Sequence, residues 1–201
     1  MSFNYPNFNP EPGNLTYQIQ TDYITSKIRD KTLPLDSLDN KKITSLIASN
    51  NPRDPIFFWQ LYSVLGESPI HTLIFVFYEN IFNDNDKWFS EEFIELGSLE
   101  YHVKGQKRFW LDIMGGGEKY INGMNRLNLR HSLVENIMTL EGANKWLYNM
   151  NKALNDPRVY LTEDCRVIYC INDFLNYFMN KYSNKFNFHN NYNIIQFKSK
   201  F

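Results

Sequence analysis

Cysteine is scarce in this chain of 201 residues, which has only Cys165 and Cys170. They are five apart in a stretch that we interpret as helix, where their side chains point in different directions and a disulfide would be strained. We therefore expect two free, buried thiols in a reducing compartment. The sequence also has no CxxC or HxxxH pattern, so a zinc site has little support.

Strong charge and long apolar runs are missing as well. The net charge is −1, with acidic and basic residues interleaved, so the chain lacks the field that holds a polyanion such as nucleic acid. No apolar run approaches the ~18 to 20 residues needed to span a bilayer, and the start, MSFNYPNFNPEPG, lacks the features of a secretory signal. We expect a cytoplasmic protein with no membrane span and no nucleic-acid partner.

Aromatic residues, by contrast, are abundant at 16%, with 16 Phe and 13 Tyr, so many large rings must be buried. The length suits one domain with an extension. Residues 1–52 are rich in Asn, Asp, Pro and Thr and end at the helix-breaking cluster NNPRDP. We predict an N-terminal extension that is partly helical or irregular, with a short helix within SLDNKKITSLIAS, then one domain over residues 53–184 and a tail over 185–201.

The spacing of apolar residues in the central domain predicts helices. An aromatic-rich helix pauses at Gly66 and restarts at Ser68 and Pro69, where Ser can cap and Pro suits the first turn. The segment NDNDKWFSEEF is a loop or short helix whose Phe89 and Phe93 cover a core edge. Further helices follow in SLEYHVKGQKRFWLDIMGGG, which three glycines end, in EGANKWLYNMNKALNDP and in TEDCRVIYCINDFLNYFMNKY. With no competing strand pattern, the predicted fold class is all-α.

Polar side chains interrupt several of the apolar helical faces. His102 and Gln106 share a face with Leu99, Phe109 and Ile113, and both either point inward or lie exposed at the margin of that face. Similar positions are held by Tyr78, His131 and Trp146, which as a set indicate a pocket, although Tyr78 and Trp146 can also simply fill space and His131 can be an ordinary half-buried histidine. No nucleophile is paired with a base, so hydrolysis is poorly supported, and a cofactor with one protein ligand suits the set better.

Four collinear motifs resemble the truncated hemoglobins, most closely their second group. They are the opening segment LYSVLGESPIHTLIFVFYENIF, the distal helix and glycine motif QKRFWLDIMGGGEKY, the ligand segment RLNLRHSLV and the tryptophan helix NKWLYNMNKAL. The chain departs from the first motif, because Glu67 stands where the family has a second glycine. The resemblance covers about residues 56–182, and an ordered set is far more specific than any single motif.

This resemblance implies a two-over-two helical sandwich around haem b. His131 would be the proximal iron ligand, and Tyr78, Gln106 and Trp146 would face the ligand on the distal side. His102 stands where the second group usually has a small residue, and it either gates the side entrance, bonds the ligand or acts as a sixth iron ligand. The remaining cofactor contacts implied by the resemblance are the propionate partners and two haem-facing rings, namely Arg130, Tyr120, Arg126, Phe109 and Phe93.

Three functions follow from these expectations. The first is a haem protein that binds dioxygen, and also NO and CO, and uses it in nitric oxide detoxification or peroxide chemistry with an external reductase, since the chain has no flavin or nicotinamide motif. The second is a non-enzymatic gas binder or sensor. The third is a helical structural module without haem. The sequence does not decide whether the protein is an enzyme or what its oligomeric state is.

Overall fold

The computed structural model describes residues 3–6, 8–118, 120 and 135–188. This part of the chain consists of helices and their connecting loops, with one isolated bridge between Glu11 and Gly116. The all-α expectation is therefore confirmed. The α-helices are α1 (Thr16–Arg29), α2 (Lys41–Thr44), α3 (Leu61–Leu65), α4 (Glu67–Phe82), α5 (Lys87–Leu96), α6 (Leu99–Ile113), α8 (Leu140–Leu154) and α9 (Cys165–Phe186), with 3₁₀ turns η1 (Phe58–Gln60) and η2 (Glu135–Ile137).

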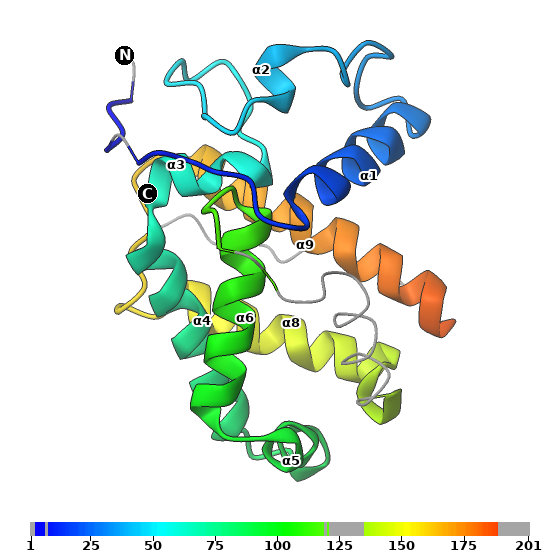
Figure 1. Ribbon diagram of the computed structural model, residues 1–201. Helices are drawn as coiled ribbons and strands as arrows, with labels where there is room; N and C mark the ends of the chain where they lie inside the picture. The colour runs from blue at the N-terminus through cyan, green and yellow to red at the C-terminus, as the bar shows by residue number, and fades with distance from the viewer. Residues whose placement is uncertain (1–2, 7, 119, 121–134, 189–201) are drawn as a thin grey trace.

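Two long helices form the centre of the molecule. α4 packs against α6 on one side and α8 on another, and Figure 1 shows α4 and α6 upright with α8 and α9 crossing them. The contacts follow from the predicted stripe of α4, because Ile70, Ile74, Phe77, Tyr78 and Ile81 are all buried in one cluster. Packing around this stripe positions α5, α6 and α8, three of the helices that line the cavity described below.

Local signals explain most helix ends. Ser98 caps α6 by accepting a hydrogen bond from the Tyr101 N–H, and Asp164 caps α9 through Arg166 N–H. The predicted start of α4 is wrong, because the helix begins at Glu67, and its cap position is Gly66 at φ 63°, a conformation that suits glycine. Ser68 therefore lies inside the helix and is not its cap.

The cysteine expectation is corrected in part. Both thiols are free, and Cys170 is buried, so that its pKa is raised by loss of solvent around the thiolate. Cys165, however, is exposed, because it is the first residue of α9 and lies just after the capping carboxylate of Asp164. Side chains five residues apart on a helix point in different directions, which is why a disulfide was not expected. For the same reason Cys170 can be buried while Cys165 is exposed.

The segment before residue 53 packs onto the core. Leu15 and Ile19 belong to the same buried cluster as α4 and α6, and α1 contacts α6 directly. The backbone of Glu11 pairs with the glycine turn after α6, donating to Gly115 O at 2.8 Å and accepting from Gly117 N–H at 2.8 Å. A side chain at Gly115 would lie 2.6 Å from the carbonyl oxygen of Trp59, so this close approach requires glycine.

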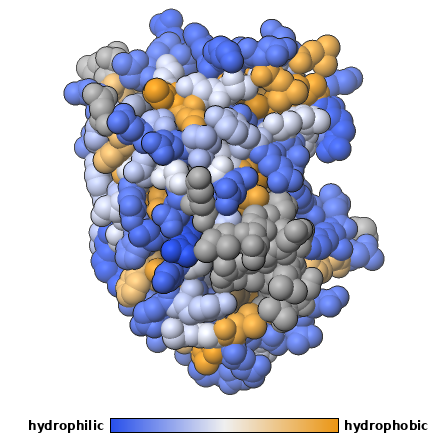
Figure 2. Space-filling view, viewed as in Figure 1, coloured by the Kyte–Doolittle hydropathy of each residue, from blue (hydrophilic) through white to orange (hydrophobic). Residues whose placement is uncertain are grey.

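The visible surface is mostly hydrophilic. Figure 2 shows polar residues over most of the described part of this face, with apolar residues scattered among them, which is the usual pattern of a globular domain. Within the described residues, no helix is both long enough and apolar enough to cross a membrane.

Candidate functional site: an aromatic cavity with polar groups

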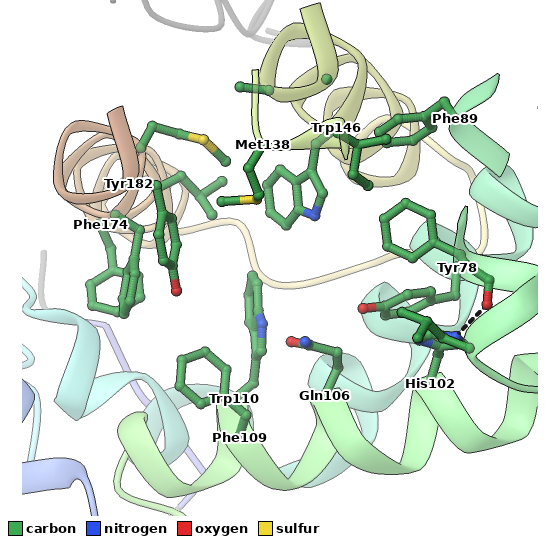
Figure 3. Close-up of a pocket in the computed structure, with 18 of the residues that line it drawn as sticks. Tyr78, Phe89, His102, Gln106, Phe109, Trp110, Met138, Trp146, Phe174 and Tyr182 are labelled. Carbon is green, nitrogen blue, oxygen red and sulfur yellow. Dashed lines mark hydrogen bonds between the residues drawn. The ribbon is translucent and has the colours of Figure 1, made fainter. Parts of the chain in front are cut away.

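A cavity of about 180 Å³ lies among α4, α5, α6, α8 and α9. Most of its wall is apolar and aromatic, and a few polar groups interrupt it (Figure 3). A largely apolar cavity with few convergent polar groups is the usual form of a site for an organic cofactor. The lining residues that bear on function are Tyr78, Phe89, Phe93, Tyr101, His102, Gln106, Phe109, Trp110, Met138, Trp146, Phe174, Phe178 and Tyr182.

Tyr78 comes from the buried stripe of α4. Its side chain is 4% exposed, and its hydroxyl points into the cavity (Figure 3). The ring stacks on that of His102, with centroids 5.2 Å apart and planes 23° apart, and its edge meets Phe77. Neighbours on two sides therefore fix the direction of the phenol.

α6 supplies both polar residues of its mixed stripe. His102 is only 6% exposed, and Gln106 is half-buried with its amide directed into the cavity (Figure 3). The alternative that both lie exposed at the margin of the face is thus wrong for His102. The next turn of the same helix adds Phe109 and Trp110 to the wall, as the helical period requires.

A short backbone contact holds the ring of His102. Its Nε2 lies 2.8 Å from the carbonyl oxygen of Phe93. A carbonyl only accepts, so Nε2 carries the proton and donates. The rings of Phe93 and Phe82 meet the imidazole edge-on, at 5.8 and 5.7 Å between centroids. His102 therefore forms the wall behind Tyr78 and links α6 to α5.

Trp146 enters from α8, with its indole nitrogen facing the cavity (Figure 3). Its ring contacts Phe77 at 4.7 Å. Residues beside it on α8 are anchored by the buried carboxylate of Asp84, which accepts from Asn149 at 2.9 Å and pairs with Lys145 at 2.9 Å. Burial alone would raise the pKa of Asp84, but hydrogen bonds from Asp86 N–H, Asn149 and Lys145 outweigh it and lower this pKa below its ordinary value.

The sequence analysis missed three polar aromatic residues of the cavity, Tyr101, Trp110 and Tyr182. Tyr182, on α9, points its hydroxyl inward, and Trp110 lies between it and Gln106 (Figure 3). Burial raises the pKa of the Tyr182 phenol above its ordinary value. A signal was present for Tyr182, because it lies one turn beyond the buried Phe178 within TEDCRVIYCINDFLNYFMNKY, which the sequence analysis predicted to be helical.

The predicted cofactor residues divide into three groups. Phe93 and Phe109 line the cavity, as do the four distal candidates. Tyr120 is 2% exposed and does not line it; its ring packs on Phe109 at 5.6 Å, and its backbone N–H donates to Asp112 at 2.8 Å. The last group, His131, Arg130 and Arg126, lies outside the described residues.

A family model described as bacterial-like globin matches residues 60–179, more than half of the chain. The chain belongs to the bacterial-like globin family. The all-helical architecture of the described residues agrees with a globin fold. A search of curated proteins found no match for this globin.

The cavity of this globin fits the cofactor that the family implies, which is haem. A flat, mostly apolar macrocycle needs aromatic and aliphatic walls, and Phe93, Phe109, Phe174 and Phe178 provide them. Tyr78, Gln106 and Trp146 direct polar groups into the cavity, and the hydroxyl of Tyr182 enters from the side opposite Tyr78 (Figure 3). Among the described residues, no group of three or more His, Cys, Asp or Glu side chains could hold a metal ion.

Proposed function

We propose that this globin is a truncated hemoglobin of the second group, which binds haem b in the aromatic cavity with His131 as the proximal iron ligand. The observation that carries the proposal is the convergence of three polar groups from three helices, Tyr78, Gln106 and Trp146, on one apolar cavity in a chain of a globin family. The histidine-bearing segment RLNLRHSLV supports the choice of ligand, since its motif matches the one that supplies the proximal histidine in that group.

When bound, the haem iron offers a coordination site for a diatomic ligand such as dioxygen, NO or CO. The protein's part is to orient and stabilise that ligand. The phenol O–H of Tyr78, the amide of Gln106 and the indole N–H of Trp146 can each donate to it, at roughly 1 to 3 kcal/mol for each bond to a charged acceptor. Several donors favour slow release of dioxygen, which suits its use in a reaction better than its transport.

Three residues are proposed to bind the haem propionates, Arg130, Arg126 and Tyr120, although the place of Tyr120 outside the cavity wall does not itself support this role. An arginine binds a carboxylate through a charge-assisted fork, and a tyrosine through one O–H bond. Phe93 and Phe109 are proposed to contact the flat faces of the ring, which their place in the cavity wall supports. We assign residues 53–184 to the globin domain, 1–52 to an extension and 185–201 to a tail.

The favoured reactions are oxidation of nitric oxide by bound dioxygen and reduction of peroxide. Both need electrons for repeated turnover, so we propose an external reductase. A cytoplasmic setting agrees with the two free thiols, because such compartments keep cysteines reduced.

The second candidate function is a gas sensor. It is favoured by one contact, the docking of α1 onto the cavity helix α6, through which a change at the site could reach the extension. Fast reaction of the dioxygen complex with nitric oxide would favour the first candidate.

Absorption spectra of the haem-loaded protein test the assignment of the ligand. The ferric, ferrous and CO forms are recorded for the wild type, for His131→Ala and for His71→Ala, whose exposed side chain on α4 makes it a matched control. We expect the Soret band to weaken or shift strongly in His131→Ala alone. Equal spectra in all three proteins would refute His131 as the ligand, and a wild type that retains no haem would refute the function as a whole.

A further inference from the structure

Aromatic side chains connect the cavity to Tyr177, which lies on the next turn of α9 from Phe174. The shorter connection starts at Tyr182, whose hydroxyl points into the cavity (Figure 3). Its ring is 5.9 Å from that of Phe178, and Phe178 is 5.8 Å from Tyr177, both measured between centroids. One phenylalanine therefore separates the cavity phenol from Tyr177.

A second connection reaches Tyr177 from another oxidisable ring of the wall, Trp110. Its indole meets Phe58 edge-on at 5.8 Å, and Phe58 stacks on Phe174 with planes only 4° apart and centroids 3.4 Å apart. Phe174 is in turn 6.3 Å from Tyr177. Among the ring contacts of the described residues, both connections meet at Tyr177, so a substitution there interrupts both.

Beyond Tyr177 the rings continue into the N-terminal extension. Tyr23 of α1 meets Tyr177 at 5.2 Å, and its other edge meets Trp59 at 5.6 Å. The Tyr23 hydroxyl donates to one carboxylate oxygen of Asp173, and Lys27 Nζ lies 2.7 Å from the other. The Asp173 side chain is 45% exposed, so the series of rings ends at a carboxylate in contact with solvent.

We propose that these rings carry electrons from the surface at Tyr23 to the cavity, so that the haem-loaded globin reduces a peroxide with electrons from an external one-electron donor. This inference rests on the proposed function, because the oxidising reaction takes place in the haem cavity. Phenols and indoles are the side chains that lose an electron most readily, and Tyr182, Trp110, Tyr177 and Tyr23 place four of them in a series of ring contacts. The phenylalanines between them keep the rings in contact.

The electrons and protons balance as follows. Hydrogen peroxide accepts two electrons and two protons, its O–O bond breaks, and two water molecules form. Each electron comes from Tyr23, whose phenolic O–H bond breaks as its proton passes to the carboxylate of Asp173. A reducing phenol or ascorbate then returns one electron to the Tyr23 radical and releases one proton to solvent, and the proton on Asp173 moves back to the Tyr23 oxygen. The cycle repeats once for the second electron, so the two protons that the peroxide takes up from solvent are balanced by the two that the donor releases.

The surroundings of Asp173 suit a proton acceptor. Burial raises the pKa of this carboxyl above its ordinary value, so it takes up a proton more readily than a fully solvated aspartate does. Lys27 Nζ lies 2.7 Å from the same carboxylate. The Tyr23 side chain is itself 7% exposed, so its proton leaves through Asp173 and not directly to bulk water.

Radical trapping in the haem-loaded full chain tests the inference. Wild type, Tyr177→Phe and Tyr169→Phe are mixed with hydrogen peroxide, frozen for electron paramagnetic resonance, and in parallel treated with a spin trap whose adducts are located by mass spectrometry. Tyr177→Phe keeps the ring and its packing but removes the oxidisable hydroxyl. Tyr169→Phe, on the same helix and 67% exposed, is the matched control.

We expect adducts on Tyr23 or Trp59 in the wild type and in Tyr169→Phe, and their loss in Tyr177→Phe with radicals retained at Tyr182 or Trp110. Equal labelling of Tyr23 in all three proteins, or labelling of none of them at Tyr23 or Trp59, would overturn the inference. Absorption spectra of the same samples separate the two proposals. Normal haem spectra without a Tyr23 adduct refute only the electron route, whereas the absence of bound haem refutes the proposed function as well.

Discussion

At the scale of single residues, the hydrogen bond of His102 to Phe93 helps to choose among the three roles that the sequence leaves open for His102. These are a gate at the side entrance, a hydrogen-bond partner of the ligand and a sixth iron ligand. Nε2 is the histidine nitrogen that usually reaches a metal from a distal position, and here it donates to a carbonyl 2.8 Å away. To bind iron through it, His102 must break this bond and leave the stack with Tyr78. The contacts therefore favour a wall or gate over a sixth ligand.

We predict that the ferrous, ligand-free, haem-loaded protein is five-coordinate and high-spin, and that His102→Ala leaves this state unchanged. The physical reason is that the bond to Phe93 and the ring contacts hold the imidazole in the cavity wall. Visible absorption and resonance Raman spectra check it, with His71→Ala as the control. A six-coordinate, low-spin ferrous form that becomes five-coordinate only in His102→Ala would show that the histidine binds iron.

Residue-level sequence reasoning worked where a helical period fixed the direction of a side chain. It placed Tyr78, His102, Gln106 and Trp146 on inward faces, and all four line the cavity. It did not predict the hydrogen bond from His102 to Phe93. This bond joins the imidazole Nε2 to a backbone carbonyl on the preceding helix, and no repeat in the sequence marks such a contact. Such a contact depends on how α5 packs on α6, which is a property of the tertiary structure.

At the scale of elements, the clearest difference is α1, which the sequence analysis did not predict. Its segment TYQIQTDYITSKIR is largely polar, its cap position is Leu15, and no side chain caps it locally. The missing cap comes from another helix. Asp112 of α6 is fully buried and accepts from the N–H groups of Asn14 at 2.8 Å and Leu15 at 2.7 Å, which no local pattern can reveal.

We predict that Asp112→Ala lowers the free energy of unfolding by roughly 3 kcal/mol, because several buried donors lose their acceptor together. Besides the two N–H groups at the start of α1, the carboxylate accepts from Tyr120 N–H at 2.8 Å. Urea unfolding followed by circular dichroism measures the change. Asp36→Ala, at an exposed position, is the control and should change stability little. A loss below about 1 kcal/mol would mean that water replaces the carboxylate and that α1 is not anchored by it.

Elements with a clear apolar stripe were predicted correctly. The stretches that became α4, α6, α8 and α9 were each predicted as helices, and the segment predicted as a loop or short helix contains α5. On α8, however, the face expected to be buried is buried only at Met150, whereas Trp146 and Leu154 are half-buried. The start of α4 was predicted wrongly because a Ser-Pro pair is a common helix signal, whereas the actual cap is a glycine with positive φ. The apolar spacing of a helix is a more reliable signal than its cap, because it is repeated over many residues.

At the scale of the whole molecule, the aromatic content has a structural explanation. Rings from α4, α5, α6, α8 and α9 form the cavity wall, and further rings continue through Tyr177 to Tyr23 in the extension. The sequence predicted that many rings are buried, but not that they meet in one series, because the contacts join segments more than 100 residues apart, such as Tyr23 and Tyr177. The extension thus contributes both to the core and to the path proposed here.

The account as a whole depends on haem occupying this cavity with Tyr78, Gln106 and Trp146 facing its ligand. The most direct test is the rate at which dioxygen leaves the haem-loaded protein, measured by stopped flow in the wild type, Tyr78→Phe, Trp146→Phe and the control Trp88→Phe, whose ring is 42% exposed. Loss of one donor should speed release about tenfold or more in the two cavity variants and leave the control unchanged. Unchanged rates in both cavity variants would contradict the account, because the polar groups of the cavity would then not face the bound ligand.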